Sequence, residues 1–340
     1  MGRRPNRRRS VYHEEESSSE PSSTDESEEN DTEEDTSSED EDGNGSGLGT
    51  QFNWLAEFKR KKIYFNPEAF CNVEWDGDGI PILEEFDMDM LPPDGTIVNF
   101  GKRRTGKTVC TKNILLALAH FFPRAYVFSD TNDLNHNYDD HFPEHAIYEW
   151  EDDAVLASML ELQKKIKERP DYEELEARMP DFDRFMVVFD DVIRDENLIR
   201  YSKPLRTAFV EGRHYKGCFL LNTQYHKAIP PTMRTNVDVA FLFQSMDKGV
   251  RETIFELFGQ EWQDKNLFYA VLDAYTKDHS TLVFYNVDSK ERDLTKRFFW
   301  YRGLPEEELP PFKMGNEEFW MEGCEDDETG LQKPGLMTSA

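Results

Sequence analysis

The sequence has few cysteines and no long apolar run. Four cysteines stand far apart in 340 residues, without a Cys-x-x-Cys pair or the spacing of metal ligands. Scattered thiols are typical of reduced proteins in the cytosol, so we predict neither a disulfide scaffold nor a zinc site. No secretory leader is recognisable, and no apolar stretch reaches the about 18 residues that a membrane-spanning helix needs. We therefore expect a soluble chain that does not span a membrane.

Basic side chains are also scarce, because 40 Lys and Arg stand against 69 Asp and Glu, for a net charge of −29. This balance argues against a simple nucleic-acid coat protein. The first fifty residues alone carry sixteen acidic and five basic side chains, a balance of −11, with almost no apolar content. Such a segment cannot bury enough surface to offset its ordering entropy, so we predict a disordered acidic tail over residues 1–50. We interpret the arginine cluster in residues 3–9 as a solvated run of charge; the alternatives are a nuclear-targeting signal and a phosphate-binding patch.

Order is expected to begin near Phe52. Residues 51–95 are rich in aromatic side chains such as Trp54 and Trp75, which more often pack on a core than stack on nucleic-acid bases. Pro92 then indicates a turn before the first strand. We predict an aromatic lead-in that packs against the main domain.

Short apolar runs recur after this lead-in, and each ends in polar residues. They cover residues 126–130, 185–191, 218–224, 239–244 and 282–285, after a first run at 96–100. Continuous apolar runs of this length are typical of strands buried on both faces. Helical patterns lie between them at 108–118, 155–166 and 250–258. This alternation predicts an α/β domain over residues 96–303 with a mainly parallel sheet flanked by helices, followed by a C-terminal extension over 304–340.

One stretch between the first run and the first helix fits the phosphate-binding pattern G-x-x-x-x-G-K-[ST]. It consists of Gly101, Lys102, Arg103, Arg104, Thr105, Gly106, Lys107 and Thr108. Glycines in such a loop let backbone N–H groups point at phosphates near the positive end of a helix. Lys107 would then reach the phosphates, and the Thr108 hydroxyl would bind Mg²⁺. We interpret the stretch as a nucleotide-binding loop, with an ordinary Gly/Lys surface turn as the alternative.

Polar residues at two strand ends are candidates for the chemistry. Asp190 and Asp191 close the strongest apolar run, where an acid commonly serves Mg²⁺ and a second acid orients or deprotonates water. We assign Asp190 to the metal and Asp191 to the water, with a helix N-cap pair as the alternative. Gln224 ends the next run and is a candidate sensor of the γ-phosphate, with a turn residue as the alternative. We expect its strand to lie between the strand that precedes the loop and the strand that ends at Asp190.

The charge balance reverses between residues 194 and 216, where six cations stand against three acids. Local positive charge in an acidic body predicts a surface that faces a polyanion, either DNA or the nucleotide of a neighbouring subunit. Arg213 and Arg234 are the candidates for an arginine that acts on a neighbour's phosphates, and a structural salt bridge is the alternative for each.

Five motifs in this order resemble a known family. They are G-K-R-R-T-G-K-T, V-V-F-D-D, G-R-H-Y, L-N-T-Q-Y and I-P-P-T-M-R-T-N. The chain is similar, over about residues 96–303, to the poxvirus-type DNA-packaging ATPases of large nucleocytoplasmic DNA viruses, within the FtsK–HerA superfamily. The motifs G-R-H-Y and N-T-Q-Y, in that order, are more specific than the first two.

The resemblance implies a P-loop NTPase with a RecA-like sheet that uses ATP and Mg²⁺ to drive double-stranded DNA into a preformed capsid. It also implies a homo-oligomeric ring, pentamer or hexamer, that works at a viral capsid or inner membrane vertex. The expected location is the host cytoplasm, in a viral factory, or the virion. The alternatives are another P-loop DNA motor, such as a helicase or a cellular translocase, and a scaffold that binds nucleotide without hydrolysing it.

Overall fold

The computed structural model describes residues 73–150, 153–192, 201–224, 233, 235–288 and 290–321, which all lie in one compact unit over residues 49–340. No helix among these residues has both the length and the apolar character needed to cross a membrane. The strands are β1 (Thr96–Phe100), β2 (Arg124–Ser129), β3 (Ile147–Tyr148), β4 (Phe185–Asp190), β5 (Gly217–Thr223), β6 (Val239–Leu242), β7 (Thr281–Tyr285) and β8 (Phe298–Tyr301). The α-helices are α2 (Lys107–Leu118), α3 (Asn132–Asn135), α4 (Ala154–Lys167), α5 (Tyr172–Arg178), α7 (Lys203–Glu211), α9 (Lys248–Ile254), α10 (Lys265–Tyr275) and α11 (Glu317–Met321). Shorter helical turns are η2 (Met88–Met90), η3 (Ala119–Phe121), η4 (Glu144–Ala146), η5 (Gly212–Tyr215), η6 (Phe255–Gly259), η7 (Gln260–Trp262), η8 (Leu294–Lys296) and η9 (Glu306–Glu308).

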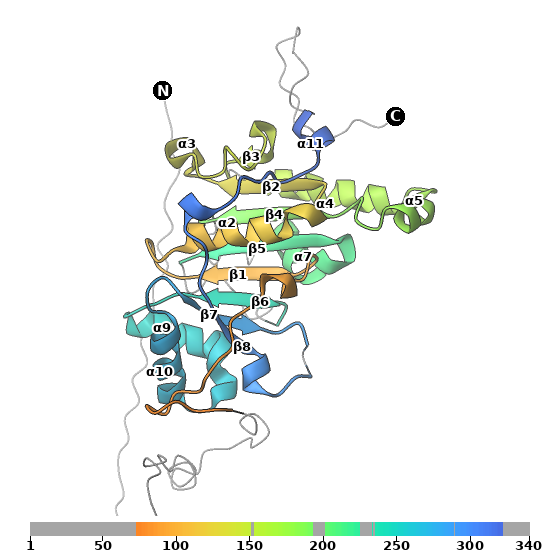
Figure 1. Cartoon of the computed structure of the whole chain (residues 1–340). Coiled ribbons are helices and arrows are strands. Elements are labelled where there is room, and N and C mark those ends of the chain that lie inside the picture. Colours follow the sequence, from red (N-terminus) through yellow and green to blue (C-terminus); the bar gives the residue numbers. More distant parts are fainter. Residues whose placement is uncertain are drawn as a thin grey trace, which may run out of the picture. The chain divides into compact units, whose positions relative to one another are not determined.

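The strands form one sheet in the order β3-β2-β4-β5-β1-β6-β7-β8 (Figure 1). Neighbours from β3 to β6 run parallel, and β7 runs antiparallel to both β6 and β8. The prediction of a mainly parallel α/β sheet is therefore confirmed. The prediction that β5 lies between the Asp strand β4 and the loop strand β1 is also confirmed.

Alternate residues of the strands enter two separate cores. Ile97 of β1 and Val188 of β4 pack on the face covered by α2, together with Ile114 and Leu115 of that helix. The opposite face carries α4, α7, α9 and α10, whose apolar side chains pack on residues such as Phe189 (Figure 1). Both faces of the sheet are covered, which explains why these strands are apolar throughout.

Some elements were not predicted from the sequence. The helices α7 and α10, the two-residue strand β3 and the strand β8 all went unassigned, although α7 and α10 begin with caps. Ser202 accepts a hydrogen bond from the Leu205 amide, and Asp264 accepts from the amides of Asn266 and Leu267. The acidic segment bounded by Pro170 and Pro180 contains the short helix α5, which buries no residue.

Segments on both sides of the α/β domain pack against it. In the lead-in, Leu83, Phe86 and Leu91 are buried, and the Phe86 ring contacts Phe241 edge-on at a centroid distance of 5.8 Å. Of the two aromatics named in the prediction, Trp75 is partly buried and packs against the core, and Trp54 lies outside the described residues.

After β8 the chain runs past α2 toward α11 (Figure 1). Asn113 of α2 exchanges hydrogen bonds with the backbone of Leu304, at 2.9 and 3.0 Å. Farther along, the amide of Met314 donates to the carbonyl of His141 at 2.8 Å. We call residues 302–321 the C-terminal segment; it holds α2 and the region after β2 together.

Candidate nucleotide-binding site

The loop of residues 101–108 joins the carboxyl end of β1 to the first turn of α2 in the middle of the sheet. Two glycines are required there for different reasons. Gly106 precedes α2 with φ +98°, a conformation that other residues rarely adopt. At Gly101 a β-carbon would lie 2.6 Å from Cβ of Phe243, so only a hydrogen fits. Arg104 also has a positive φ, of 63°. The backbone thus has the tight turns that a phosphate-binding loop needs.

Lys107 is folded into this loop. Its side chain donates to the carbonyl oxygens of Gly101 at 2.7 Å and of Lys102 at 3.0 Å. Only 8% of the residue is exposed, and this burial lowers the pKa of the ammonium group, against the opposing charges of Asp191 and Asp190. The ammonium group therefore lies near both carboxylates, with its donors bound to neutral carbonyls.

The other loop side chains face outward. Lys102, Arg103 and Arg104 are exposed. Lys102 lies 3.7 Å from a carboxylate oxygen of Asp247 in an exposed ion pair, and the Thr105 hydroxyl donates to the carbonyl of Lys102 at 2.9 Å. The three cations are therefore accessible from solvent at the carboxyl edge of the sheet.

The candidate residues at the ends of β4 and β5 lie beside the loop. Asp190 is the last residue of β4 and pairs in register with Asn222 of β5. Asp191 follows with φ 54°, and its amide donates to the Asn222 carbonyl at 3.2 Å. The Gln224 amide nitrogen donates to Oδ2 of Asp191 at 3.4 Å. Three strands thus bring Lys107, both acids and Gln224 to one edge of the sheet.

Thr108 and Asp190 are the residues that could hold Mg²⁺ beside a nucleotide. Both offer hard oxygen atoms, and Mg²⁺ in such sites takes most of its ligands from phosphates and water. The described residues contain no cluster of three or more His, Cys, Asp or Glu side chains able to hold a metal. The oxygen atoms of Thr108 and Asp190 are of the type that binds a cation shared with phosphate oxygens.

Arg213 lies away from the loop of its own chain. It belongs to η5, before β5 begins, and forms an ion pair with Asp238, which precedes β6. Asp238 is 2% exposed and also accepts from the Thr96 amide at 2.8 Å, where β1 begins. The loop follows the other end of β1, five residues on, or about 16 Å at about 3.3 Å per residue. Within one chain, Arg213 therefore does not join the site, and the other candidate, Arg234, lies outside the described residues.

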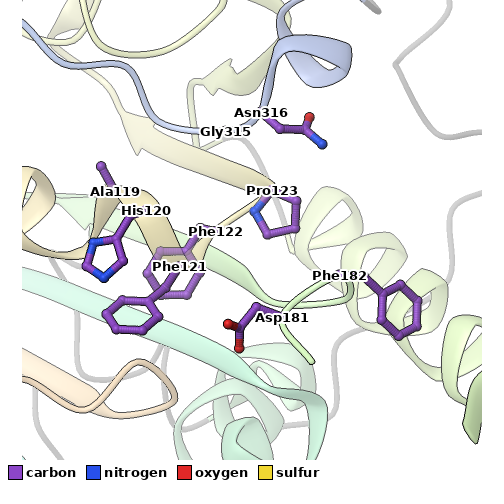
Figure 2. Close-up of a pocket in the computed structure, with 9 residues that line it drawn as sticks. All are labelled: Ala119, His120, Phe121, Phe122, Pro123, Asp181, Phe182, Gly315 and Asn316. Atoms are coloured by element: carbon purple, nitrogen blue, oxygen red, sulfur yellow. The ribbon is translucent and has the colours of Figure 1, made fainter. Parts of the chain in front are cut away.

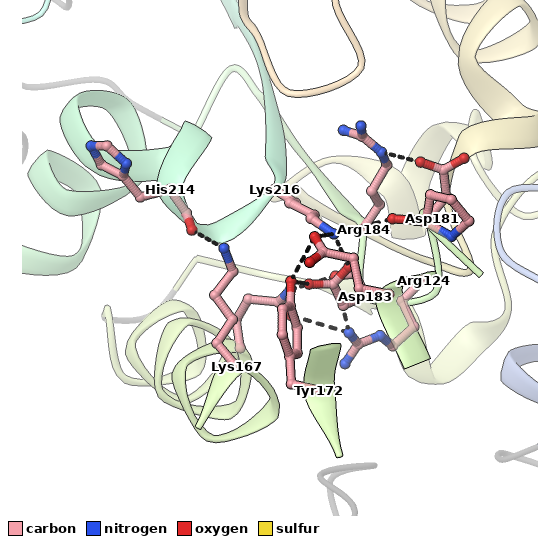
Figure 3. A network of polar contacts seen from close by, with 11 residues as sticks. Arg124, Lys167, Tyr172, Asp181, Asp183, Arg184, His214 and Lys216 are labelled. Atoms are coloured by element: carbon pink, nitrogen blue, oxygen red, sulfur yellow. Dashed lines mark hydrogen bonds and ion pairs between the residues drawn. The ribbon is translucent and has the colours of Figure 1, made fainter. Parts of the chain in front are cut away.

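The basic stretch is only partly free to meet a polyanion. Figure 3 shows the Lys216 ammonium inside a polar network, where it lies 2.7 Å from Glu176 and 2.9 Å from the fully buried Asp183. Burial alone would lower the pKa of Lys216, but its hydrogen bonds to these acids raise it above the ordinary value. Of the remaining cations, Lys203 and Arg206 are exposed on α7. Arg194 and Arg200 lie outside the described residues.

A cavity of about 320 Å³ lies at the far end of α2 from the loop (Figure 2). The rings of Phe121, Phe122 and Phe182 line it together with His120 and Asp181. The twelve residues of α2 place it about 18 Å from the loop, at about 1.5 Å per residue. This cavity is not part of the nucleotide site.

Polar residues behind the site went unnoticed in the sequence. Asn99, Thr111 and Asn222 are each 0% exposed, and the fully buried Tyr138 lies near Asp190. Burial raises the pKa of the Tyr138 hydroxyl well above its ordinary value, and the negative charge of Asp190 raises it further. The signal in the sequence was an asparagine inside an apolar strand, in both Ile97-Val98-Asn99-Phe100 and Leu220-Leu221-Asn222.

Comparison with known proteins identifies a viral family. Residues 84–261, just over half of the 340-residue chain, match the model of the family described as Poxvirus A32 protein. The chain is 24% identical over 246 residues to Uncharacterized protein 075L of Invertebrate iridescent virus 6, covering 70% of this chain and 91% of that one. It is 24% identical over 267 residues to Uncharacterized protein 015R of Frog virus 3, covering 76% and 78%. The genome packaging NTPase B204 of Sulfolobus turreted icosahedral virus 2 is a similar solved structure, with a TM-score of 0.44 and 13% identity over 63% of this chain and 100% of that one.

Proposed function

Because the chain belongs to the poxvirus A32 protein family, we propose that it hydrolyses ATP to move double-stranded viral DNA into a capsid. The observation that carries the proposal is the meeting of Lys107, Asp191 and Gln224 at the carboxyl end of the loop strand. Ligands of open α/β sheets bind at that edge. We propose the virion and the viral factory in the host cytoplasm as the places where it acts.

ATP binding would begin at the loop. Its backbone N–H groups and the N-terminus of α2 suit the β- and γ-phosphates. Lys107 would exchange its bonds to the carbonyls of Gly101 and Lys102 for bonds to charged phosphate oxygens, which are stronger acceptors. Thr108 and Asp190 would hold Mg²⁺ when the nucleotide is present, and the cation neutralises charge on the transferred phosphoryl group.

Hydrolysis requires a water molecule aligned with the γ-phosphate. Asp191 would orient this water and accept its proton. Gln224, which contacts Asp191 at 3.4 Å, would respond to the presence of the γ-phosphate and pass the change to β5. These two residues thus have separate roles in one small cluster.

A ring would complete the site across subunits. Arg213 lies at the amino edge of the sheet with 57% of its side chain exposed, so a neighbour's loop could approach it in a head-to-tail arrangement. An arginine supplied in this way stabilises the charge that develops on the phosphoryl group. A ring of five or six subunits at a capsid or inner membrane vertex would then couple turnover to movement of DNA.

ATP turnover measured with and without double-stranded DNA tests the proposal. Turnover that DNA stimulates, without strand separation, supports a translocase; strand separation would instead indicate a helicase, and no turnover would indicate a nucleotide-binding scaffold. Lys107→Ala should abolish turnover while the protein remains folded, and full activity in that variant would refute the assignment.

Mixed rings test the role of Arg213. Subunits carrying Arg213→Ala and subunits carrying Lys107→Ala are each expected to be inactive alone. Mixing them creates interfaces in which an intact loop meets an intact arginine, so some hydrolysis should return. No recovery at any ratio would contradict a role in trans.

A further inference from the structure

A row of polar side chains crosses the centre of the sheet beneath the nucleotide site. Asn99 of β1 pairs in register with Asn222 of β5, which pairs with Asp190 of β4. These residues follow Ile97, Leu220 and Val188 by two positions, so they lie on the face of the sheet that α2 covers. The positions two residues earlier on these three strands are apolar, and both asparagines are fully buried. Buried amides are costly unless each of their polar atoms is bonded.

The amide of Asn222 is the centre of this row. Its Nδ2 donates to Oδ1 of Asp190 at 2.8 Å. Its Oδ1 accepts from Nδ2 of Asn99 at 2.9 Å and from the hydroxyl of Thr111 at 3.0 Å. Asn99 also donates to the Thr111 hydroxyl oxygen, at 3.0 Å. One side chain thus bonds the Asp strand, the loop strand and the loop helix.

The bonding pattern allows only one orientation of this amide. An ionised carboxylate can only accept hydrogen bonds, so the Asn222 atom that faces Asp190 must be the NH₂ group. The carbonyl oxygen must then face Asn99 and Thr111, and both donate to it. If the Asn222 amide were rotated by half a turn, its NH₂ group would face the NH₂ group of Asn99, and its carbonyl oxygen would face a carboxylate oxygen of Asp190. Asn222 is therefore locked, and it engages one carboxylate oxygen of Asp190.

Thr111 connects this lock to the loop. It lies three residues after Thr108 on α2, and residues at this spacing share a face of the helix. Asn222 therefore links the element that carries Thr108 to the residue Asp190, the two positions that could hold Mg²⁺. Both links are direct hydrogen bonds; the bond to Thr111 is buried and the bond to Asp190 is partly buried. Hydrogen bonds shielded from water in this way rigidify a structure.

We propose that Asn222 is a positioning residue that sets the geometry between Thr108 and Asp190 and so makes nucleotide binding dependent on Mg²⁺. The inference rests on the proposed function, since it assumes a nucleotide at the loop. Asn222 itself touches neither nucleotide nor metal. Residues that orient a metal ligand typically change metal affinity by about 10–100-fold when they are replaced.

The test compares binding of a fluorescent ATP analogue, methylanthraniloyl-ATP, in Mg²⁺ and in EDTA. For Asn222→Leu we expect affinity in EDTA within about twofold of the wild type and affinity in Mg²⁺ lower by about tenfold or more. Thr111→Val keeps the volume of the side chain and removes only the hydroxyl, so it should weaken Mg²⁺-dependent binding in the same direction. It also decides the question if Asn222→Leu does not fold.

Asn113→Leu is the matched control. Asn113 is a buried amide on the same helix, but its hydrogen bonds go to Val109, Tyr301 and Leu304, and none to Asp190. It should leave the ratio between the two affinities unchanged, whatever it does to stability. Asn222→Leu and Thr111→Val with the wild-type ratio would overturn the inference while leaving the proposed function intact. Wild-type protein that binds no nucleotide would refute the proposed function itself.

Discussion

Replacing Gly101 by alanine should damage both the stability of the protein and its nucleotide loop. The new β-carbon would lie 2.6 Å from Cβ and 3.0 Å from Cγ of Phe243. Phe243 cannot retreat easily, because it is 1% exposed and its amide donates to the Phe100 carbonyl at 3.0 Å. Inserting one carbon into a packed site typically costs about 1–3 kcal/mol. We expect the free energy of unfolding to fall by about that amount.

Urea unfolding, followed by tryptophan fluorescence, measures this cost. Gly77→Ala is the control, because nothing lies within 4 Å of the β-carbon it would add. It should change the free energy of unfolding by less than about 0.5 kcal/mol. A Gly101→Ala protein as stable as the wild type, with unchanged nucleotide affinity, would refute the packing argument.

Substitutions at Gly106 test the effect of backbone conformation separately from the effect of packing. A β-carbon there would meet only Cε1 of Phe243, at 3.9 Å, but the φ of +98° strains any side chain. Asparagine tolerates positive φ better than alanine does. Gly106→Asn should therefore be milder than Gly106→Ala, whereas at Gly101 the larger asparagine should be the worse of the two. The opposite order at either position would contradict the reason given for that glycine.

Three further predictions concern titratable groups that are buried or, for His141, half-buried. Burial lowers the pKa of His141 below its ordinary value of 6.5. The stability that the neutral imidazole contributes is therefore present above pH 6.5 and is lost as pH falls through the lowered pKa. In urea unfolding, His141→Phe should lose less stability than the wild type between pH 7.5 and 5.5. Burial raises the pKa of Asp238 above its ordinary value of 3.8. Its contribution to the free energy of unfolding is therefore fully present below pH 3.8 and is lost as pH rises through the raised pKa. The stability of Asp238→Asn relative to the wild type should increase as pH rises through this interval, and a constant difference would contradict the prediction. Cys110 and Cys218 are buried and their thiol pKa values are raised, so mass spectrometry after brief alkylation should find both unmodified until urea unfolds the protein.

Much of the fold could be predicted because its signals are local. The apolar run predicted at residues 185–191 is β4, and the helical pattern at 155–166 is α4 with one more residue at each end. The helix α10 was missed although Asp264 caps it and Phe268, Val271 and Leu272 give it a buried face. The strand β8 is four residues long and its partner β7 precedes it by a long connection, so no hairpin signal marks it.

The candidate site divides in the same way. The loop of residues 101–108 could be recognised because its function depends on eight consecutive residues between a strand and a helix. The acids at 190 and 191 and Gln224 could be proposed because parallel strands end at one edge. The roles of these residues remain predictions. Their position beside Lys107 is a property of the fold, and it agrees with the expectation that parallel strands end at one edge of the sheet.

By itself, then, the sequence determined the loop, the alternation of strands and helices, and the polar ends of the strands. The tertiary structure alone decided that Lys216 is held by Asp183 and that Arg213 faces away from its own loop. It also decided that Asn222 bonds Asn99 across 123 residues of sequence. The physical reason is that periodicity and turn chemistry act over a few residues. Which side chains face each other across neighbouring strands is settled only when the sheet assembles.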